Sequence, residues 1–244
     1  MQIQERNENI INYNIPLETT SIWSFPDRGK WSLHSSEYRG NWSPYVPYNL
    51  ITRYTKEGEW VLDPFLGGGT TGIEACRLKR NFIGVDINPK VVAENKKRLS
   101  QISSKMHINI RVGDARNLDF LKNESVSLIC LHPPYFDIIK YSKNIEGDLS
   151  IMGLKEFYSS IKGVAREAYR IVKKNRHVAF MIADARKKGY IEPLGAKCLQ
   201  IFMNEGFKLK ETIIKEQHNC KSTSKWQGRG IILLKHEYLY VFIK

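Results

Sequence analysis

Cysteine is scarce in this sequence, and its spacing excludes two classes of structure. There are four cysteines in 244 residues, and no two of them are spaced as in a CxxC pair. This sparse pattern excludes a disulfide framework and argues against a zinc site, so we predict no metal centre. The cysteines are expected to be free thiols that mostly pack in the interior: Cys76, Cys130, Cys198 and Cys220.

Long apolar runs are also absent. No stretch approaches the roughly 20 consecutive apolar residues that a membrane-spanning helix needs. The first 14 residues are too polar for a secretory signal. We therefore expect a cytoplasmic protein with no membrane partner.

Acidic residues are fewer than basic ones. Lys and Arg number 38 against 25 Asp and Glu, which gives a formal net charge of +13. An excess of this size favours a polyanionic partner, which means nucleic acid or an anionic membrane surface. Because 42% of the residues are apolar, the chain can still bury a core. Its length suits one large domain, or one domain with an attached segment.

Residues 1–55 and 56–244 differ in character. The first range contains Trp and Pro at short intervals and predicts an irregular arm that packs over a core and ends in a short helix at 48–54. The second range alternates strand signals with helical periodicity, so we expect it to form the main domain. This alternation predicts a doubly wound α/β fold with right-handed crossovers.

The expected sheet is Rossmann-like, seven-stranded and mostly parallel, with an antiparallel hairpin at its edge. Buried parallel strands are predicted at 60–62, 82–85, 108–112, 126–131 and 177–183, and the hairpin at 207–215 and 237–243. Helical patterns lie between the parallel strands and before the hairpin, at 73–78, 91–102, 157–171 and 194–202.

A glycine-rich turn, DPFLGGGTT from Asp63 to Thr71, separates the first expected strand from its helix. Three glycines allow the backbone to approach a ligand and to turn sharply into the helix. Asp86 ends the next strand at a spacing that suits a carboxylate receiving ribose hydroxyls, and Asp114 ends the third strand, where it can accept from an adenine amino group. Glycines alone also fit a plain tight turn, but the ordered set of turn and strand-end acids favours a nucleoside site. The spacing is not GxGxxG, and the missing GK[ST] excludes a P-loop.

The fourth expected strand ends in His132-Pro133-Pro134-Tyr135. Two adjacent prolines fix the backbone and remove two N–H donors, so carbonyl groups in the loop stay free to accept from a ligand. An aromatic ring directly after them can stack on a base. A bare PPY also fits a rigid turn with a structural histidine and a core tyrosine. Its place after the fourth strand favours a site for a planar group with an exocyclic amine.

These motifs resemble those of the S-adenosylmethionine-dependent DNA amino-methyltransferases, which modify cytosine N4 or adenine N6. The glycine turn is similar to their motif I, and the HPPY loop is similar to their motif IV. The segment RGNWSP, which contains Asn41, Trp42 and Pro44, resembles motif X. The order X, I, IV is that of the alpha and gamma classes, and the resemblance covers about residues 23–244.

The resemblance implies S-adenosylmethionine as cofactor and a methyltransferase sheet. In the target site, His132 and the Pro133 carbonyl would orient the amine next to Pro134, and Tyr135 would stack on the flipped base. The implied cofactor contacts are Asn41, Trp42, Pro44, Asp63, Phe65, Gly67, Gly69, Thr70, Asp86, Ile87, Asp114 and Ala115.

His132 departs from the family pattern, which usually has Asp, Asn or Ser at this position. Because histidine can be neutral, its presence slightly favours cytosine N4 over adenine N6 as the predicted target atom. The expected reaction is direct attack of a flipped base's amine on the sulfonium methyl, without a covalent intermediate. Thiolate attack would need a cysteine beside the motif, and Cys130 lies inside the preceding strand.

Basic and aromatic residues in two loops are predicted to contact nucleic acid, although a solvated basic surface is the alternative. They are Phe136, Lys140, Tyr141 and Lys143 beside the HPPY loop, and His218, Lys221, Lys225, Trp226 and Arg229 farther along the chain. The core consumes most of the chain, so we expect no separate target-recognition domain. A homodimer or a partner subunit is one way to supply sequence readout.

The leading function is a DNA methyltransferase of a restriction-modification system. RNA is an alternative substrate, and a non-catalytic nucleic-acid-binding module with this fold is a third possibility. A methyltransferase acting on a small molecule or a protein glutamine would share the PPY motif but would not need the positive charge.

Overall fold

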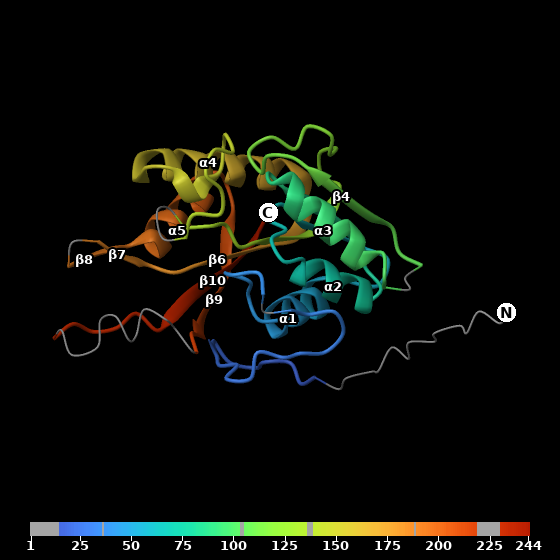
Figure 1. Cartoon of the computed structure of the whole chain (residues 1–244), viewed down its shortest axis with the longest axis horizontal. Coiled ribbons are helices and arrows are strands. Elements are labelled where there is room, and N and C mark those ends of the chain that lie inside the picture. The colour runs from blue at the N-terminus through green and yellow to red at the C-terminus, as the bar shows by residue number, and fades with distance from the viewer. Residues whose placement is uncertain (1–14, 36, 103–104, 136–138, 188, 219–229) are drawn as a thin grey trace.

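The computed structural model describes residues 15–35, 37–102, 105–135, 139–187, 189–218 and 230–244. Its main sheet has eight strands in the order β1-β9-β10-β6-β5-β2-β3-β4, and β7 and β8 form a separate two-stranded ribbon (Figure 1). None of the helices in these ranges combines the length and the hydropathy that a membrane span requires.

The strands are β1 Ile22–Trp23, β2 Trp60–Asp63, β3 Asn81–Asp86, β4 Ile108–Val112, β5 Val126–Leu131, β6 Val172–Ile182, β7 Ala185–Lys187, β8 Tyr190–Glu192, β9 Lys208–Glu216 and β10 His236–Ile243. The helices are α1 Tyr45–Tyr54, α2 Thr70–Arg77, α3 Pro89–Leu99, the short 3-10 helix Leu149–Ile151, α4 Leu154–Ile171 and α5 Leu194–Asn204.

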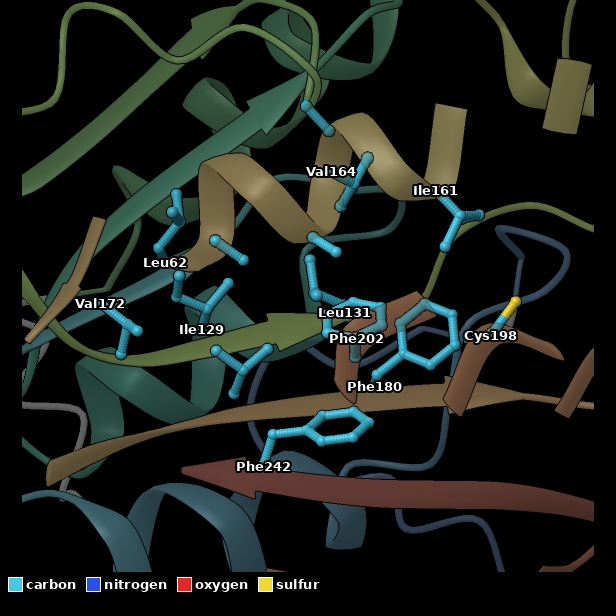
Figure 2. Close-up of a cluster of buried hydrophobic side chains, with 14 of the residues drawn as sticks. Leu62, Ile129, Leu131, Ile161, Val164, Val172, Phe180, Cys198, Phe202 and Phe242 are labelled. Atoms are coloured by element: carbon cyan, nitrogen blue, oxygen red, sulfur yellow. The ribbon is translucent and has the colours of Figure 1, made fainter. Parts of the chain in front are cut away.

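Helices cover both faces of the sheet, which confirms the predicted doubly wound α/β class. Figure 1 shows α4 and α5 together on one side and α1 and α2 on the other. On the first side, Ile161 and Val164 of α4 pack with Phe202 of α5 against strand residues such as Ile129 and Phe180 (Figure 2). On the second side, side chains of α1, α2 and α3 pack against the alternate strand positions. Two buried faces explain why the central strands have nearly continuous apolar sequences.

The parallel strands β2, β3, β4, β5 and β6 all end at one edge of the sheet. β10 runs antiparallel to β6, with Tyr238 opposite Ile182, so β10 begins at that same edge. β9 runs antiparallel to β10 and therefore ends there. Ligand sites of open α/β sheets lie at the carboxyl edge of the parallel strands. Residues at the start of β10 consequently join those at the ends of β2 to β5.

The structure differs from the prediction in several details. An eighth strand, β1, comes from the N-terminal arm and pairs in parallel with β9, with Ile22 opposite Ile214. A strand of two residues is too short to show the alternation of apolar and polar residues by which strands are predicted. The helix predicted at 48–54 begins earlier, at Tyr45, and the strand predicted at 177–183 begins at Val172. Charged residues in the first part of β6 hide its strand character.

Candidate active site

One cavity, with a volume of about 280 Å³, lies at the carboxyl edge of the parallel strands. Residues from the glycine turn, the ends of β3 and β4, and the HPPY loop line it together. Asn41 and Trp42 of the N-terminal arm also line it. The structure thus brings the motif I-like, motif IV-like and motif X-like segments to one site. Of the predicted cofactor residues, Gly69 and Pro44 do not line the cavity, and Pro44 lies at the N-cap of α1.

The glycine turn is held by hydrogen bonds from three directions. Gly67 and Gly69 have φ angles of +47° and +77°, the left-handed region that favours glycine. The Gly67 N–H donates to Asp86 Oδ2 at 3.0 Å, and the Gly68 N–H donates to Asn41 Oδ1 at 3.0 Å. From α3, Asn95 Nδ2 donates to the Gly67 carbonyl at 2.7 Å. The turn is therefore a preformed cradle rather than a loop that needs a ligand to order it.

Two acidic residues beside the turn carry raised pKa values. Burial raises the pKa of Asp63 to about 7, although the Thr71 hydroxyl and the Phe65 N–H both donate to its carboxyl. Burial also raises the pKa of Asp86, whose oxygens accept from the Gly67 and Asn88 N–H groups. Asp86 lines the cavity, and each of its oxygens keeps a lone pair for a further donor such as a ribose hydroxyl.

Asp114 has a partner that the sequence did not indicate. Arg116 Nε lies 3.0 Å from both carboxylate oxygens of Asp114, and Arg116 Nη2 lies 2.6 Å from Oδ2. Arg116 is also held by Ser160 of α4 at 3.2 Å. Asp114 and Ala115 line the cavity as predicted, but Asp114 already accepts from a guanidinium. An adenine amino group would have to share this carboxylate.

The N-terminal arm is anchored next to the site by a buried carboxylate. Glu74 of α2 is fully buried, and its Oε1 accepts from Trp31 Nε1 at 2.8 Å and lies 2.7 Å from His34 Nε2. Arg77, one turn later, donates to the same carboxylate. Because a buried carboxylate without partners would be costly, these contacts fix the arm just before Asn41 and Trp42. Glu74 was not among the predicted site residues, because one acid within a helical pattern gives no sequence signal of such a role.

The HPPY loop forms the opposite wall of the cavity. All four of its residues line it, and the Trp42 ring stacks on the His132 ring with centroids 5.5 Å apart at 21°. The Tyr135 hydroxyl donates to Glu237 Oε1 at 2.9 Å, and His132 Nε2 lies 3.3 Å from that hydroxyl. Tyr135 therefore lines the cavity while its hydroxyl is bound to Glu237, which lines the same cavity.

Glu237, at the start of β10, is the main residue of this wall that the sequence analysis missed. Its Oε2 accepts from Lys215 Nζ at 3.0 Å, and its Oε1 lies 3.7 Å from His132 Nε2. Burial alone would raise the pKa of Glu237, but His132 and Lys215 hold it below its ordinary value. One sequence signal could have identified Glu237. The last predicted strand is antiparallel and begins with this acid, so the acid must lie at the carboxyl edge of the parallel strands.

The predicted nucleic-acid contacts fall in different surroundings. Lys140 and Lys143 are exposed, whereas Tyr141 lines the cavity and stacks on Tyr38 with ring centroids 5.8 Å apart. His218 is partly buried and lies 3.0 Å from the Ser24 hydroxyl. The remaining predicted contacts lie outside the described residues: Phe136, Lys221, Lys225, Trp226 and Arg229.

The described cysteines are not part of the site. Cys76, Cys130 and Cys198 are free and buried, and Cys220 lies outside the described residues. Burial raises the pKa of the Cys130 thiol well above its ordinary value, with a smaller contribution from Asp63. A thiol in this state is a poor nucleophile.

Comparisons with known proteins identify related methyltransferases. A DNA methylase family model matches residues 2–97, and a model described as RMKL-like, methyltransferase domain, matches residues 50–193. The chain is 47% identical over 55 residues to the Type II methyltransferase M2.DpnII of Streptococcus pneumoniae, a match that covers 22% of this chain and 20% of the relative. It is 46% identical over 57 residues to M2.LlaDCHI of Lactococcus lactis subsp. cremoris, which covers 23% and 21%. The matches thus span about a fifth of the length of these curated relatives.

The fold is shared with solved methyltransferase structures. The crystal structure of TrmN from Thermus thermophilus superposes with a TM-score of 0.59 at 20% identity, covering 85% of this chain and 51% of that one. Other solved structures with this fold are described as SAM-dependent methyltransferases, and S-adenosylmethionine is the cofactor that the motifs of this chain predict. The resemblance to the DNA amino-methyltransferases is confirmed by the DNA methylase model and the Type II relatives. The chain belongs to the RMKL-like methyltransferase-domain family, whose model matches more than half of it.

Proposed function

We propose that this protein transfers the methyl group of S-adenosylmethionine to an exocyclic amino nitrogen of a base in DNA. The observation that carries the proposal is the single cavity that joins the glycine turn to the HPPY loop. A ligand bound along the turn would place its reactive end toward His132, where a second, planar ligand can enter. Such a two-ligand cavity suits group transfer by proximity and orientation.

The residues around the turn fit this cofactor. The left-handed glycines bring the backbone close to the cavity, and Asp86 is placed to accept from the ribose hydroxyls. Ile87 and Ala115 offer apolar surface at the end where the adenine would lie, and Asn41 and Trp42 close the methionine end. When bound, S-adenosylmethionine supplies an electrophilic methyl group, so the protein itself needs no nucleophile.

At the target end, the protein must accept hydrogen bonds from an amine. The lone pair of an exocyclic amine is conjugated with its ring, and accepting its hydrogens favours the state in which the lone pair is available. His132 and the Pro133 carbonyl would supply the acceptors, and the Tyr135 ring would support the base by stacking. The base must leave its stack to reach them, which costs a few kcal/mol. This arrangement favours cytosine N4 slightly over adenine N6, because His132 replaces the family's usual acidic or amide residue.

The partner follows from charge and from the relatives. The net charge of +13 suits a nucleic acid, and the relatives M2.DpnII and M2.LlaDCHI are Type II methyltransferases. We therefore favour DNA and a restriction-modification role in the cytoplasm. Residues 56–244 would be the catalytic domain and residues 1–55 its arm, and a second copy or a partner subunit would supply part of the sequence readout.

Transfer of tritiated methyl groups tests the proposal directly. Purified protein is incubated with labelled S-adenosylmethionine and with duplex DNA, single-stranded DNA or RNA, and the products are digested for nucleoside mass spectrometry. We expect N4-methylcytosine from DNA, with N6-methyladenine as the alternative. Label in RNA alone would move the substrate to RNA, and label only on protein or a small molecule would refute the nucleic-acid claim. Calorimetry that detects no cofactor binding would instead favour a non-catalytic binding module.

A further inference from the structure

A largely buried chain of polar groups lies next to the HPPY loop, and three of its members, His132, Tyr135 and Glu237, line the cavity. It runs from Lys215 of β9 to Glu237 of β10, then to the Tyr135 hydroxyl and to His132 Nε2, with successive distances of 3.0, 2.9 and 3.3 Å. Lys215 and Glu237 are paired residues of the β9–β10 ladder, so the sheet itself fixes their positions. Only 6% of Glu237 is exposed. Buried polar networks of this kind persist when every member has a partner.

The direction of each hydrogen bond follows from counting hydrogens. An ionised carboxylate only accepts, so Lys215 and Tyr135 must both donate to Glu237. The tyrosine hydroxyl has a single hydrogen, which is thus committed to Glu237 Oε1. Its oxygen can then only accept from His132, and this requires a hydrogen on Nε2. Glu237 Oε1 itself lies 3.7 Å from His132 Nε2, and its negative charge also favours a hydrogen on this nitrogen.

We propose that Glu237 is a positioning residue that holds the hydrogen of His132 on Nε2, so that the lone pair of Nδ1 is presented to the target amine. This inference rests on the proposed function for the identity of the amine. His132 lines the cavity, and within the described part of the chain its Nδ1 makes no hydrogen bond. Stacking on Trp42 fixes the plane of the ring, and Glu237 fixes which nitrogen accepts. In neutral histidine, one ring nitrogen donates and the other accepts, so both constraints are needed.

The same arrangement accounts for the proton that the reaction releases. The lone pair of the amine nitrogen forms the new N–C bond, and the electron pair of the broken S–C bond stays on sulfur. The nitrogen then carries one hydrogen too many and gives a proton to Nδ1. The resulting imidazolium faces the Glu237 carboxylate through Nε2, with Tyr135 between them and Lys215 on the far side of the carboxylate. This division of roles resembles general-base catalysis by a histidine that a carboxylate orients.

Histidine ¹⁵N NMR tests the tautomer without requiring activity. The wild-type protein, labelled at histidine, should show His132 in one neutral tautomer with hydrogen on Nε2, assigned by loss of the signal in His132→Gln. In Glu237→Gln the signal should move toward a mixture of tautomers. Glu211→Gln is the matched control, because Glu211 lies on β9 of the same sheet but is exposed. A wild-type signal from the Nδ1–H tautomer, or no change in Glu237→Gln, would overturn the inference.

Single-turnover methyl transfer to DNA provides the second readout. Glu237→Gln should slow transfer by about 10–100-fold while cofactor binding, measured by calorimetry, is retained. Tyr135→Phe should slow it less, because the carboxylate can still approach Nε2. If loss of the charge leaves Lys215 unpaired and the variant does not fold, the double variant Glu237→Gln, Lys215→Met removes both charges. Equal rates in the wild type and a folded Glu237 variant would contradict the inference. A wild type that methylates no nucleic acid would refute the proposed function alone, since the NMR result stands apart from it.

Discussion

The two walls of the cavity are built in different ways. The cofactor wall, formed by the glycine turn and the ends of β3 and β4, is held by partners within about thirty residues along the chain, such as Asp86 and Asn95 for Gly67. The amine wall, formed by the HPPY loop, depends on Glu237, which is 102 residues from Tyr135. Trp42 of the arm stacks on His132, which is 90 residues later in the chain.

Because the walls are built differently, the two proposed functions of the site, cofactor binding and binding of the target amine, can vary separately. The cofactor wall is a local strand-turn-helix unit whose geometry comes with its sequence. The amine wall is assembled only when β10 enters the sheet beside β6. The cofactor wall therefore follows from the shared fold, whereas the proposed amine acceptor depends on distant residues of this particular chain.

The largest expected effect tests whether the amine wall acts alone. Replacing His132 by Ala should reduce methyl transfer by about 10²–10⁴-fold, the usual contribution of a positioned acid or base. Cofactor binding should remain, since His132 makes no bond to the glycine turn. Transfer and calorimetry on the same preparation would check this. His107→Ala is the control, because His107 is exposed just before β4, at the opposite edge of the sheet. Parallel loss of both properties in His132→Ala would mean that the walls are coupled.

A second prediction concerns pH and the cofactor wall. Burial raises the pKa of Asp63 from its ordinary value of 3.8 to about 7, so the folded protein holds a proton that the unfolded chain releases above about pH 4. Protonated Asp63 makes its full contribution to the free energy of unfolding below about pH 4. This contribution is lost as the pH rises to about 7, and the free energy of unfolding has no further dependence on Asp63 above that pH. Asp63→Asn removes this dependence, so the variant should gain stability relative to the wild type by up to about 4 kcal/mol between pH 4 and pH 8. Chemical denaturation at several pH values measures the gain, and a constant difference would show that Asp63 is already ionised in the fold.

A third prediction breaks the cofactor wall while sparing the amine wall. Gly69→Ala places a Cβ 2.0 Å from Asn95 Oδ1 at a φ of +77°. The strain should weaken cofactor binding by about 10–100-fold, equivalent to roughly 1–3 kcal/mol. Gly58→Ala is a close control, because Gly58 has the same φ of +77° but a Cβ there meets nothing within 4 Å. Calorimetric titration should separate the two variants, and equal affinities would show that the turn tolerates the clash by shifting.

Much of the fold could be predicted because its signals are local. Apolar runs with glycine breaks located the seven longer strands of the main sheet, and motif order predicted where their ends meet. The strand β1 could not be predicted, because its pairing with β9 depends on contacts almost two hundred residues apart. The start of β6 was also missed, because Lys173, Lys174 and Arg176 dominate its first residues. There, pairing with neighbouring strands prevails over intrinsic preference.

The site was predictable to the same limited extent. Asp86 and the glycines were predicted from their spacing, and the structure brings Asp86 and Gly67 to the cavity. Arg116, which pairs with Asp114, is only two residues away from it, but no pattern distinguishes this arginine from a surface charge. Glu74 and Glu237 are buried acids whose partners lie on other elements. A single acid in a strand or helix gives no sequence signal of burial, so only the packed structure identifies these two.

The smallest expected effect concerns the rim of the amine wall. Lys143 is exposed in the segment that follows the HPPY loop, where a strand of nucleic acid entering the cavity would pass. If it contacts one phosphate, Lys143→Gln should lower DNA affinity a few-fold and reduce the slope of log affinity against log salt by about 1. Lys208→Gln is the matched control, since Lys208 is exposed at the start of β9, on the opposite edge of the sheet. Fluorescence anisotropy over a salt series measures both slopes. Because a phosphate contact positions DNA without reading its sequence, the loss should be the same for every duplex tested. A loss confined to one sequence would instead show that this rim reads bases, and would place part of the specificity in the amine wall.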